Sequence, residues 1–149
     1  VQPPQCPSAE VRVAQARIIA AFVSELQALD PHANIIVAGD MNDDWFSAAL
    51  QTLAAPQTPA GEGLLNLMET LPPEERYSYL WDGNSQGPDT ILASRSLKAQ
   101  FDVVHANAEF PTGARASDHD PVLAAFDLGW RAYVPVVWGE SNSHEPESP

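Results

Sequence analysis

Residues 34–44, with the sequence NIIVAGDMNDD, decide the fold of this chain. The run from Ile35 to Ala38 is apolar and rich in β-branched residues, which predicts a short strand buried on both faces. Gly39 is predicted to end that strand, and Asp40 and Asn42 follow at once. Side chains just past such a strand lie at the mouth of a sheet, where α/β folds usually bind ligands.

Asp40 and Asn42 allow two interpretations. A carboxylate can accept a proton or hold a cation, and an amide can donate to an anionic oxygen, so the pair can form a polar site. Asp and Asn are also common in turns, where they hydrogen-bond the local backbone. For these two residues alone, the turn is the commoner interpretation. A second polar cluster downstream favours the interpretation as a polar site.

The composition is that of one globular domain. A chain of 149 residues buries roughly two-thirds of its unfolded surface, and 44% hydrophobic residues is ordinary for such a domain. The sequence has no apolar run near the ~18 residues of a membrane helix, so no transmembrane segment is predicted. Cys6 is the single cysteine, which excludes a disulfide within the chain.

The charge is strongly acidic. The chain has 7 basic and 20 acidic residues and a net charge of -13. This balance argues against a broad basic face that follows a long phosphate backbone. A polyanionic ligand would need local help, most simply from bound cations.

The segment before residue 34 predicts an amphipathic helix that covers the sheet. Ser8 is its predicted N-cap, and Asp30 and Pro31 end it. The apolar residues that recur at helical spacing, and are expected to face the sheet, are Val11, Ala14, Ile18, Phe22 and Leu29. A helix followed by a buried strand is half of an α/β unit.

The elements after residue 44 are short. Residues 47–53 predict a helix with Phe46, Leu50 and Leu53 on one side, and residues 64–68 predict a second, briefer helix. The alternating aromatic residues Tyr77, Tyr79 and Trp81 are expected to pack rather than to stack bases. Strands are predicted at residues 77–81, 90–93, 101–104 and 122–126, with residues 82–87 joining the first two.

The chain is therefore divided into three parts. Residues 1–9 are a lead-in or linker, residues 10–128 form the domain, and residues 129–149 form a polar, partly disordered tail. Just before the last strand, Ser117, Asp118, His119 and Asp120 crowd together. Such a cluster beside a buried strand is costly unless its groups are paired or coordinate an ion, although a solvated turn is an equally good interpretation of the cluster alone.

Three ordered motifs resemble the endonuclease/exonuclease/phosphatase superfamily, which includes DNase I-like nucleases and inositol polyphosphate phosphatases. They are Gly39-Asp40-Met41-Asn42, then Asp89 ahead of residues 91–94, then Ser117-Asp118-His119 with Pro121-Val122. Residues 77–79 and 82–86 are most similar to bacterial extracellular nuclease-like proteins. The resemblance extends from Ala14 to about Phe126 and corresponds to the C-terminal half of the family domain.

This resemblance implies the C-terminal half of a four-layer α/β sandwich, with a mixed, mostly antiparallel sheet and covering helices. It also implies metal-dependent phosphodiester hydrolysis by a secreted bacterial nuclease or nuclease-like phosphoesterase. The implied cofactor is Mg²⁺, or Mn²⁺ or Ca²⁺, and the implied substrate is a nucleic acid or another phosphodiester. A missing N-terminal half or self-association is expected to complete the site.

The resemblance also implies a role for each matched residue. Asp40 orients or deprotonates the attacking water, and Asn42 bonds a phosphate oxygen. Asp118 helps to bind the metal, and His119 contacts the scissile phosphate while Asp89 fixes its tautomer and raises its basicity. These groups suit an in-line displacement, which needs an oriented water and charge neutralisation.

Other residues have smaller predicted roles. Arg115 is the basic residue best placed to bind phosphate, being two residues before Ser117, and Asp120 adds negative potential. His105 is expected to line the cleft at most. The alternative function is a noncatalytic, acidic cation-binding or interaction module derived from the same fold.

Overall fold

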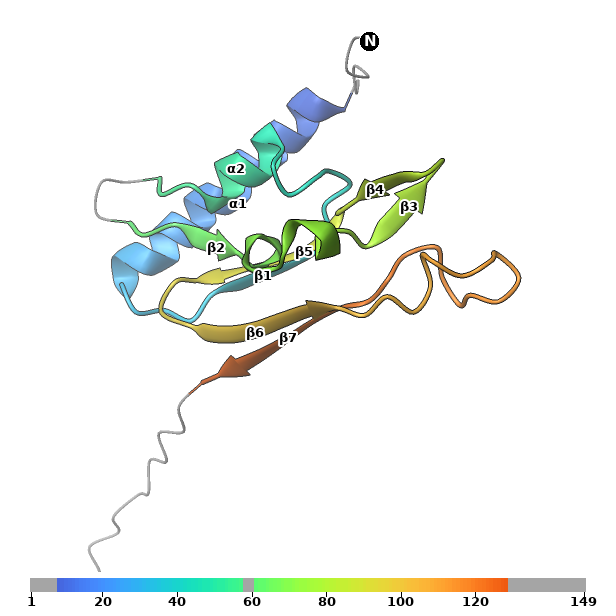
Figure 1. Cartoon of the computed structure of the whole chain (residues 1–149). Helices are drawn as coiled ribbons and strands as arrows, with labels where there is room; N and C mark the ends of the chain where they lie inside the picture. The colour runs from blue at the N-terminus through green and yellow to red at the C-terminus, as the bar shows by residue number, and fades with distance from the viewer. Residues whose placement is uncertain (1–7, 58–60, 129–149) are drawn as a thin grey trace, which may run out of the picture.

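The computed structural model describes residues 8–57 and 61–128 (Figure 1). Over these residues the chain forms two α-helices, seven strands and two short 3₁₀ turns. The helices lie together on one side of the strands, and none in the described ranges is long and apolar enough to cross a membrane. The predicted lead-in, except Ser8 and Ala9, and the whole predicted tail (residues 129–149) lie outside these ranges.

The first helix, α1, spans Ala9–Leu29 and ends at Asp30, as predicted. Ser8 is its N-cap residue, as predicted, but its side chain makes no cap hydrogen bond; its Oγ instead accepts from Arg12. The predicted buried side is also wrong. Its apolar members are exposed, at Val11 (57%), Ile18 (72%), Phe22 (58%) and Leu29 (85%), and Ala14 is exposed too.

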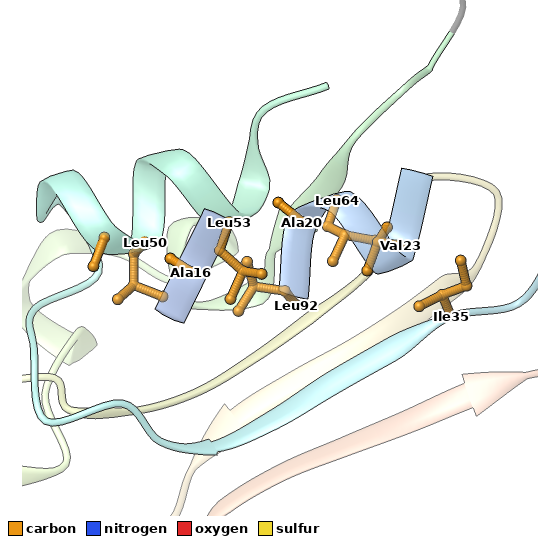
Figure 2. Close-up of a cluster of buried hydrophobic side chains, with 9 residues drawn as sticks. Ala16, Ala20, Val23, Ile35, Leu50, Leu53, Leu64 and Leu92 are labelled. Atoms are coloured by element: carbon orange, nitrogen blue, oxygen red, sulfur yellow. The ribbon is translucent and has the colours of Figure 1, made fainter. Parts of the chain in front are cut away.

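The side of α1 that is buried carries smaller residues, namely Ala16, Ala20 and Val23. Because α1 carries apolar residues around much of its circumference, spacing alone does not choose between two sides. Small side chains allow the helix to approach the second helix, α2 (Ala48–Ala54), and the sheet closely. Figure 2 shows these side chains between the two helices and the strands.

The helix α2 confirms the prediction for residues 47–53. Ser47 accepts a hydrogen bond from the Leu50 N–H and so caps its first turn. Leu50 and Leu53 are buried in the core, as expected, but Phe46 is 57% exposed and does not belong to the buried side.

Three antiparallel strands form the central sheet, in the order β1-β5-β2. They are β1 (Ile36–Asp40), β5 (Asp89–Ser94) and β2 (Leu64–Asn66). Gly39 does not end the first strand; it pairs with Thr90 inside the ladder, and Asp40 is the last residue of β1, opposite Asp89. The strand therefore continues through Gly39, where it was predicted to end, and includes the site residue Asp40.

The two faces of this sheet differ. Leu64 and Leu92 point toward the helices and are 0% exposed, each contributing roughly 1.5–3 kcal/mol by burial. The other face, called here the open face, carries Ile36, Ala38, Asp40, Asp89, Ile91 and Ala93, of which Ala93 is buried. On it Ile36 is 45% exposed, so the prediction that β1 is buried on both faces is wrong for the described chain.

Residues 64–68 are not the predicted helix. Leu64, Leu65 and Asn66 pair with β5, and only then does a 3₁₀ turn, η1 (Leu67–Thr70), begin. Asn66 caps that turn by accepting from the Met68 N–H. Pairing with the strand therefore overrides the helical preference of this leucine-rich segment. A second 3₁₀ turn, η2 (Pro73–Glu75), leads to the next strands.

The strand predicted at residues 77–81 is present as β3 (Tyr79–Trp81), but its partner is different from the expected one. Asp82 and Gly83 both have positive φ, 48° and 77°, which makes a two-residue turn that returns the chain at once. The returning strand is β4 (Asn84–Gln86), whereas β5 pairs with β1 and β2 in the central sheet. A third pair, β6 (Lys98–Val103) and β7 (Val122–Asp127), contains the last two predicted strands.

Candidate active site

The candidate site lies where β1 ends and β5 begins. These strands are antiparallel, so Asp40 and Asp89 are direct cross-strand partners on the open face. Asp40 Oδ1 accepts a 2.8 Å hydrogen bond from the Asn42 N–H, and Asn42 turns the chain with a φ of 50°. This local bond is the turn expected of Asp and Asn, and it orients the Asp40 carboxylate at the same time.

Asp89 is held by two hydrogen bonds to its Oδ2 atom. The Ser78 hydroxyl donates to it at 2.7 Å, and His119 Nδ1 donates to it at 2.6 Å. Ser78 is itself 0% exposed and accepts from the Asp89 N–H at 3.3 Å. The carboxylate is therefore fixed in direction, and it fixes the His119 ring in turn.

His119 is positioned by its backbone as well as by its ring. It forms an isolated antiparallel bridge with Tyr79, and its N–H donates to Ser117 Oγ at 3.1 Å. Partial burial lowers the pKa of His119, but the hydrogen bond to Asp89 and the nearby carboxylate charges outweigh it. The pKa of His119 is therefore raised above its ordinary value of 6.5.

The structure brings together three of the predicted residues as a group able to hold a metal ion. Ligand atoms of Asp40, Asp89 and His119 all lie within 4.8 Å of one another. Carboxylate oxygens with one imidazole nitrogen suit Mg²⁺, Mn²⁺ and similar divalent ions. Directly opposed carboxylates on neighbouring strands destabilise a sheet, and a cation removes that repulsion, so the donor set fits a metal.

The other predicted residues lie around this group. Asp118, predicted as the metal residue, is exposed and adds negative potential at His119 without belonging to the three-residue group. Asn42 lines a second pocket of about 240 Å³ together with Asp40. Arg115 is half-buried in the same loop as His119, and over the described residues no contact joins it to the group. A groove of about 400 Å³ runs beside His119, lined by Asp89, Asn107, Ser117, His119, Asp120, Pro121 and Val122.

Sequence analysis missed how the loop that carries His119 is held. Asp120 is only 2% exposed, and its Oδ1 accepts from the Asn107 N–H at 2.7 Å and the Ala108 N–H at 2.9 Å. Its Oδ2 lies 3.0 Å from His105 Nδ1. Burial raises the pKa of Asp120, but the bonds from Ala108, His105 and Asn107 outweigh it, so this pKa lies below its ordinary value.

His105 belongs to this support and does not line the groove. Its Nε2 lies 3.1 Å from a Glu75 oxygen, and its ring stacks on Tyr77 at 4.2 Å between centroids. The Tyr77 hydroxyl donates to Glu109, and that bond is the main reason that the pKa of Tyr77 is raised to about 12. The signal in the sequence was the crowding of Asp120 between His119 and Pro121, because an Asp at such a position needs partners.

Comparisons with known proteins show the family and the fold of this chain. A family model described as "Endonuclease/Exonuclease/phosphatase family" matches residues 5–111, a range that includes Asp40 and Asp89. A comparison with curated proteins finds no matching sequence. Among solved structures, the chain is similar to a mannosyl-6-phosphatase of Bacteroides thetaiotaomicron VPI-5482, with 21% identity and a TM-score of 0.55 over 80% of this chain. At that identity the likeness shows the fold, and the chain spans 46% of that structure.

Proposed function

Since this chain belongs to the endonuclease/exonuclease/phosphatase family, we propose that it is the part of a hydrolase that cleaves phosphoesters with a divalent cation held by the carboxylates of Asp40 and Asp89 beside His119. The predicted partial DNase I-like α/β fold is confirmed by the family match and by the similar structure. The finer proposal, from the motifs, is a phosphodiesterase of the nuclease type.

The observation that carries the proposal is the opposition of Asp40 and Asp89 beside His119. Two carboxylates about 4 Å apart repel by about 1 kcal/mol in a water-like environment and by more when partly buried. Over residues 8–57 and 61–128, the two carboxylates oppose each other across the β1–β5 ladder, and neither forms an ion pair with a lysine or arginine. A site for a cation and a phosphate gives both of them a function.

The proposed mechanism uses the two imidazole nitrogens differently. Nδ1 of His119 is committed to Asp89, which leaves Nε2 to face the substrate. Because the pKa of His119 is raised, the ring keeps both protons more readily near neutral pH and can donate from Nε2 to a phosphate oxygen. Asp89 therefore acts by setting the tautomer and charge of His119.

Asp40 and Asn42 act on the opposite side of the reacting phosphate. Asp40 Oδ1 is engaged by the Asn42 N–H, so its second oxygen is available to orient the attacking water and accept its proton. The Asn42 side chain is assigned to a nonbridging phosphate oxygen. When bound, a divalent cation neutralises charge on the phosphate oxygens, and Asp118 assists its binding from the edge.

The open face supports a second part of the proposal. Ile36 is 45% exposed there, and Ala38 is exposed and Ile91 half-buried beside it, next to the site carboxylates. We propose that the N-terminal half of the family domain, or a second copy of this chain, covers this face and contributes further groups. Secretion remains a prediction from the resemblance, and detection of the protein outside the cells that make it would test it.

The test is hydrolysis by the purified chain of a chromogenic phosphodiester, a chromogenic phosphomonoester and plasmid DNA, with Mg²⁺ or Mn²⁺ and with EDTA. Asp40→Asn is the site variant, and Asp102→Asn, an exposed carboxylate on β6, is its matched control. We expect diester cleavage that is abolished by EDTA and by Asp40→Asn but kept by Asp102→Asn. Faster monoester cleavage would replace the diesterase proposal with a phosphatase.

Absence of all hydrolysis has two explanations that a second step separates. Cleavage that returns when an N-terminal half is added would mean that the chain supplies only part of the site. Cation binding without hydrolysis in either state would favour the noncatalytic, cation-binding module.

A further inference from the structure

A pair of aromatic rings lies beside His119, one half-buried (Tyr79) and one exposed (Trp81). Tyr79 and Trp81 are two residues apart on β3, so their side chains share one face of the strand. Their ring centroids are 6.3 Å apart at an interplanar angle of 17°, and the Tyr79 ring lies 4.7 Å from the His119 ring. These two residues are called the aromatic shelf below.

The shelf is not explained by packing within the described chain. Trp81 is 63% exposed, and its cross-strand partner is Asn84, a short polar residue that cannot cover an indole face. Trp45 provides the contrast, because the Arg76 guanidinium lies 4.9 Å above its ring and Phe46 contacts its edge. Of these two tryptophans, only Trp81 presents most of its surface to solvent, next to a proposed catalytic residue.

The shelf is held at a fixed distance from His119. The two-residue turn at Asp82 and Gly83 closes the β3–β4 hairpin, and the Ser78 N–H donates to the Gln86 carbonyl at 2.9 Å. At its other end the hairpin is tied to the loop of His119, since the Asp120 N–H donates to the Ser78 carbonyl at 2.7 Å. A ring stacked on the shelf would therefore be presented to the site without rearrangement of the hairpin.

We propose that the aromatic shelf stacks a nucleobase of the substrate, so that the phosphoester cleaved at this site belongs to single-stranded or short nucleotide material. The proposal rests on the proposed phosphoesterase function. Aromatic side chains stack bases of any sequence, and a base is available for stacking only outside a duplex. The net charge of -13 disfavours long duplexes, whose binding depends on basic residues, while stacking needs no positive charge.

The test is binding of the dinucleotide of thymidine and of the same phosphodiester lacking both bases, measured by isothermal titration calorimetry in every variant and by the chemical shift of the Trp81 indole N–H in the wild type. Trp81→Ala removes the outer ring, Trp81→Phe keeps a smaller one, and Phe46→Ala removes another exposed aromatic as a control. We expect Trp81→Ala to weaken dinucleotide binding about tenfold, within the range known for one stacked base. Trp81→Phe is expected to recover part of that loss, and Phe46→Ala to change nothing.

The outcomes separate this proposal from the proposed function. The proposal is overturned if Trp81→Ala leaves dinucleotide binding unchanged, or if it weakens the diester without bases equally, which would indicate stacking on sugar rings or a structural effect. Binding is measured with EDTA present as well as with Mg²⁺, so a chain that cleaves nothing still answers the question. If the chain hydrolyses the dinucleotide and Trp81→Ala does not change its KM, the proposed phosphoesterase function stands and the proposed base stacking on the aromatic shelf is wrong.

Discussion

The two faces of the β1-β5-β2 sheet are built from alternate residues of the same strands, yet they serve different ends. On the face toward the helices, Leu64 and Leu92 are 0% exposed and Thr90 is buried with its hydroxyl bonded to Asn66. On the open face, Ile36 is 45% exposed and the ladder ends in Asp40 and Asp89. One face therefore stabilises the strands, which leaves the other to carry charges that a core would not tolerate.

This difference explains how a small sheet can hold opposed carboxylates. The packing of Leu92 fixes the position of β5, and the next residues outward present Asp89 to Ser78 and His119. Different residues of the same strands thus determine the stability of the domain and the chemistry of the site. Each of the following predictions tests that separation.

The largest effect is expected from Asp89→Asn on the open face. An amide keeps the size of the side chain but removes the charge that holds the His119 tautomer and its proton, so hydrolysis should fall by roughly 10²- to 10⁴-fold. Steady-state kinetics on a chromogenic phosphodiester measure this, beside Asp102→Asn. A small loss of activity, or an equal loss in the control, would contradict the role of Asp89.

The second effect concerns stability and compares the faces directly. Leu92→Ala should lower the free energy of unfolding by about 2–5 kcal/mol, because it leaves a cavity in the core. Ile36→Ala, at a site 45% exposed, should cost about 1 kcal/mol or less. Urea unfolding followed by circular dichroism measures both. Equal losses would mean that the open face is covered in solution, by a second copy for instance.

The helix shows why the sequence could not predict which face is which. The presence and order of strands follow from local residues, and strands were predicted at β1, β6 and β7, although the ends of β1 and β6 differ from the prediction. The side of α1 was not, because Ile18 and Phe22 are more hydrophobic than Ala16 and Ala20, and only the close approach of α2 decides between them. The exposure of Ile36 could not be predicted for the same reason, because it depends on which other elements cover the sheet.

The site shows a similar division. Asp40, Asp89 and His119 were selected from ordered motifs, and the structure places their ligand atoms within 4.8 Å of one another; their catalytic roles stay predictions. The buried contacts of Asp120 could not be predicted, because its partners are the N–H groups of Asn107 and Ala108, twelve or more residues away. Backbone donors in an irregular loop leave no pattern in the sequence.

A third prediction uses this buried carboxylate. The pKa of Asp120 is lower in the folded chain than its ordinary value of 3.8, so its contribution to stability is complete above pH 3.8. That contribution is lost as the pH falls through the lowered pKa of the folded state. Asp120→Asn should lower the free energy of unfolding at pH 7 by about 1–3 kcal/mol.

The control for this prediction is the pH profile itself. The difference between wild type and Asp120→Asn, measured by urea unfolding, should be constant from pH 7 to pH 5 and should shrink below about pH 4. A difference that grows toward low pH would contradict the assignment, and a matching profile for Asp102→Asn would show a general effect of charge.

The smallest effect is stabilisation by a cation. A divalent ion that binds only the folded chain raises its free energy of unfolding by about 0.4 kcal/mol when its concentration equals Kd, and by more in excess. Thermal unfolding should therefore shift upward with Mn²⁺ in wild type and in Asp102→Asn. Asp40→Asn should lose most of the shift, since it removes one of the two carboxylates that hold the cation.

The measurement that tests the central claim most directly is paramagnetic broadening by Mn²⁺ in the NMR spectrum of the assigned chain. Substoichiometric Mn²⁺ should first and most strongly broaden the signals of Asp40, Asp89 and His119, with broadening that falls with distance along β5 toward Ser94. Asp40→Asn should remove this selectivity. Broadening that starts at other acidic residues, such as Asp43 and Asp44, or that is unchanged in Asp40→Asn, would contradict the account.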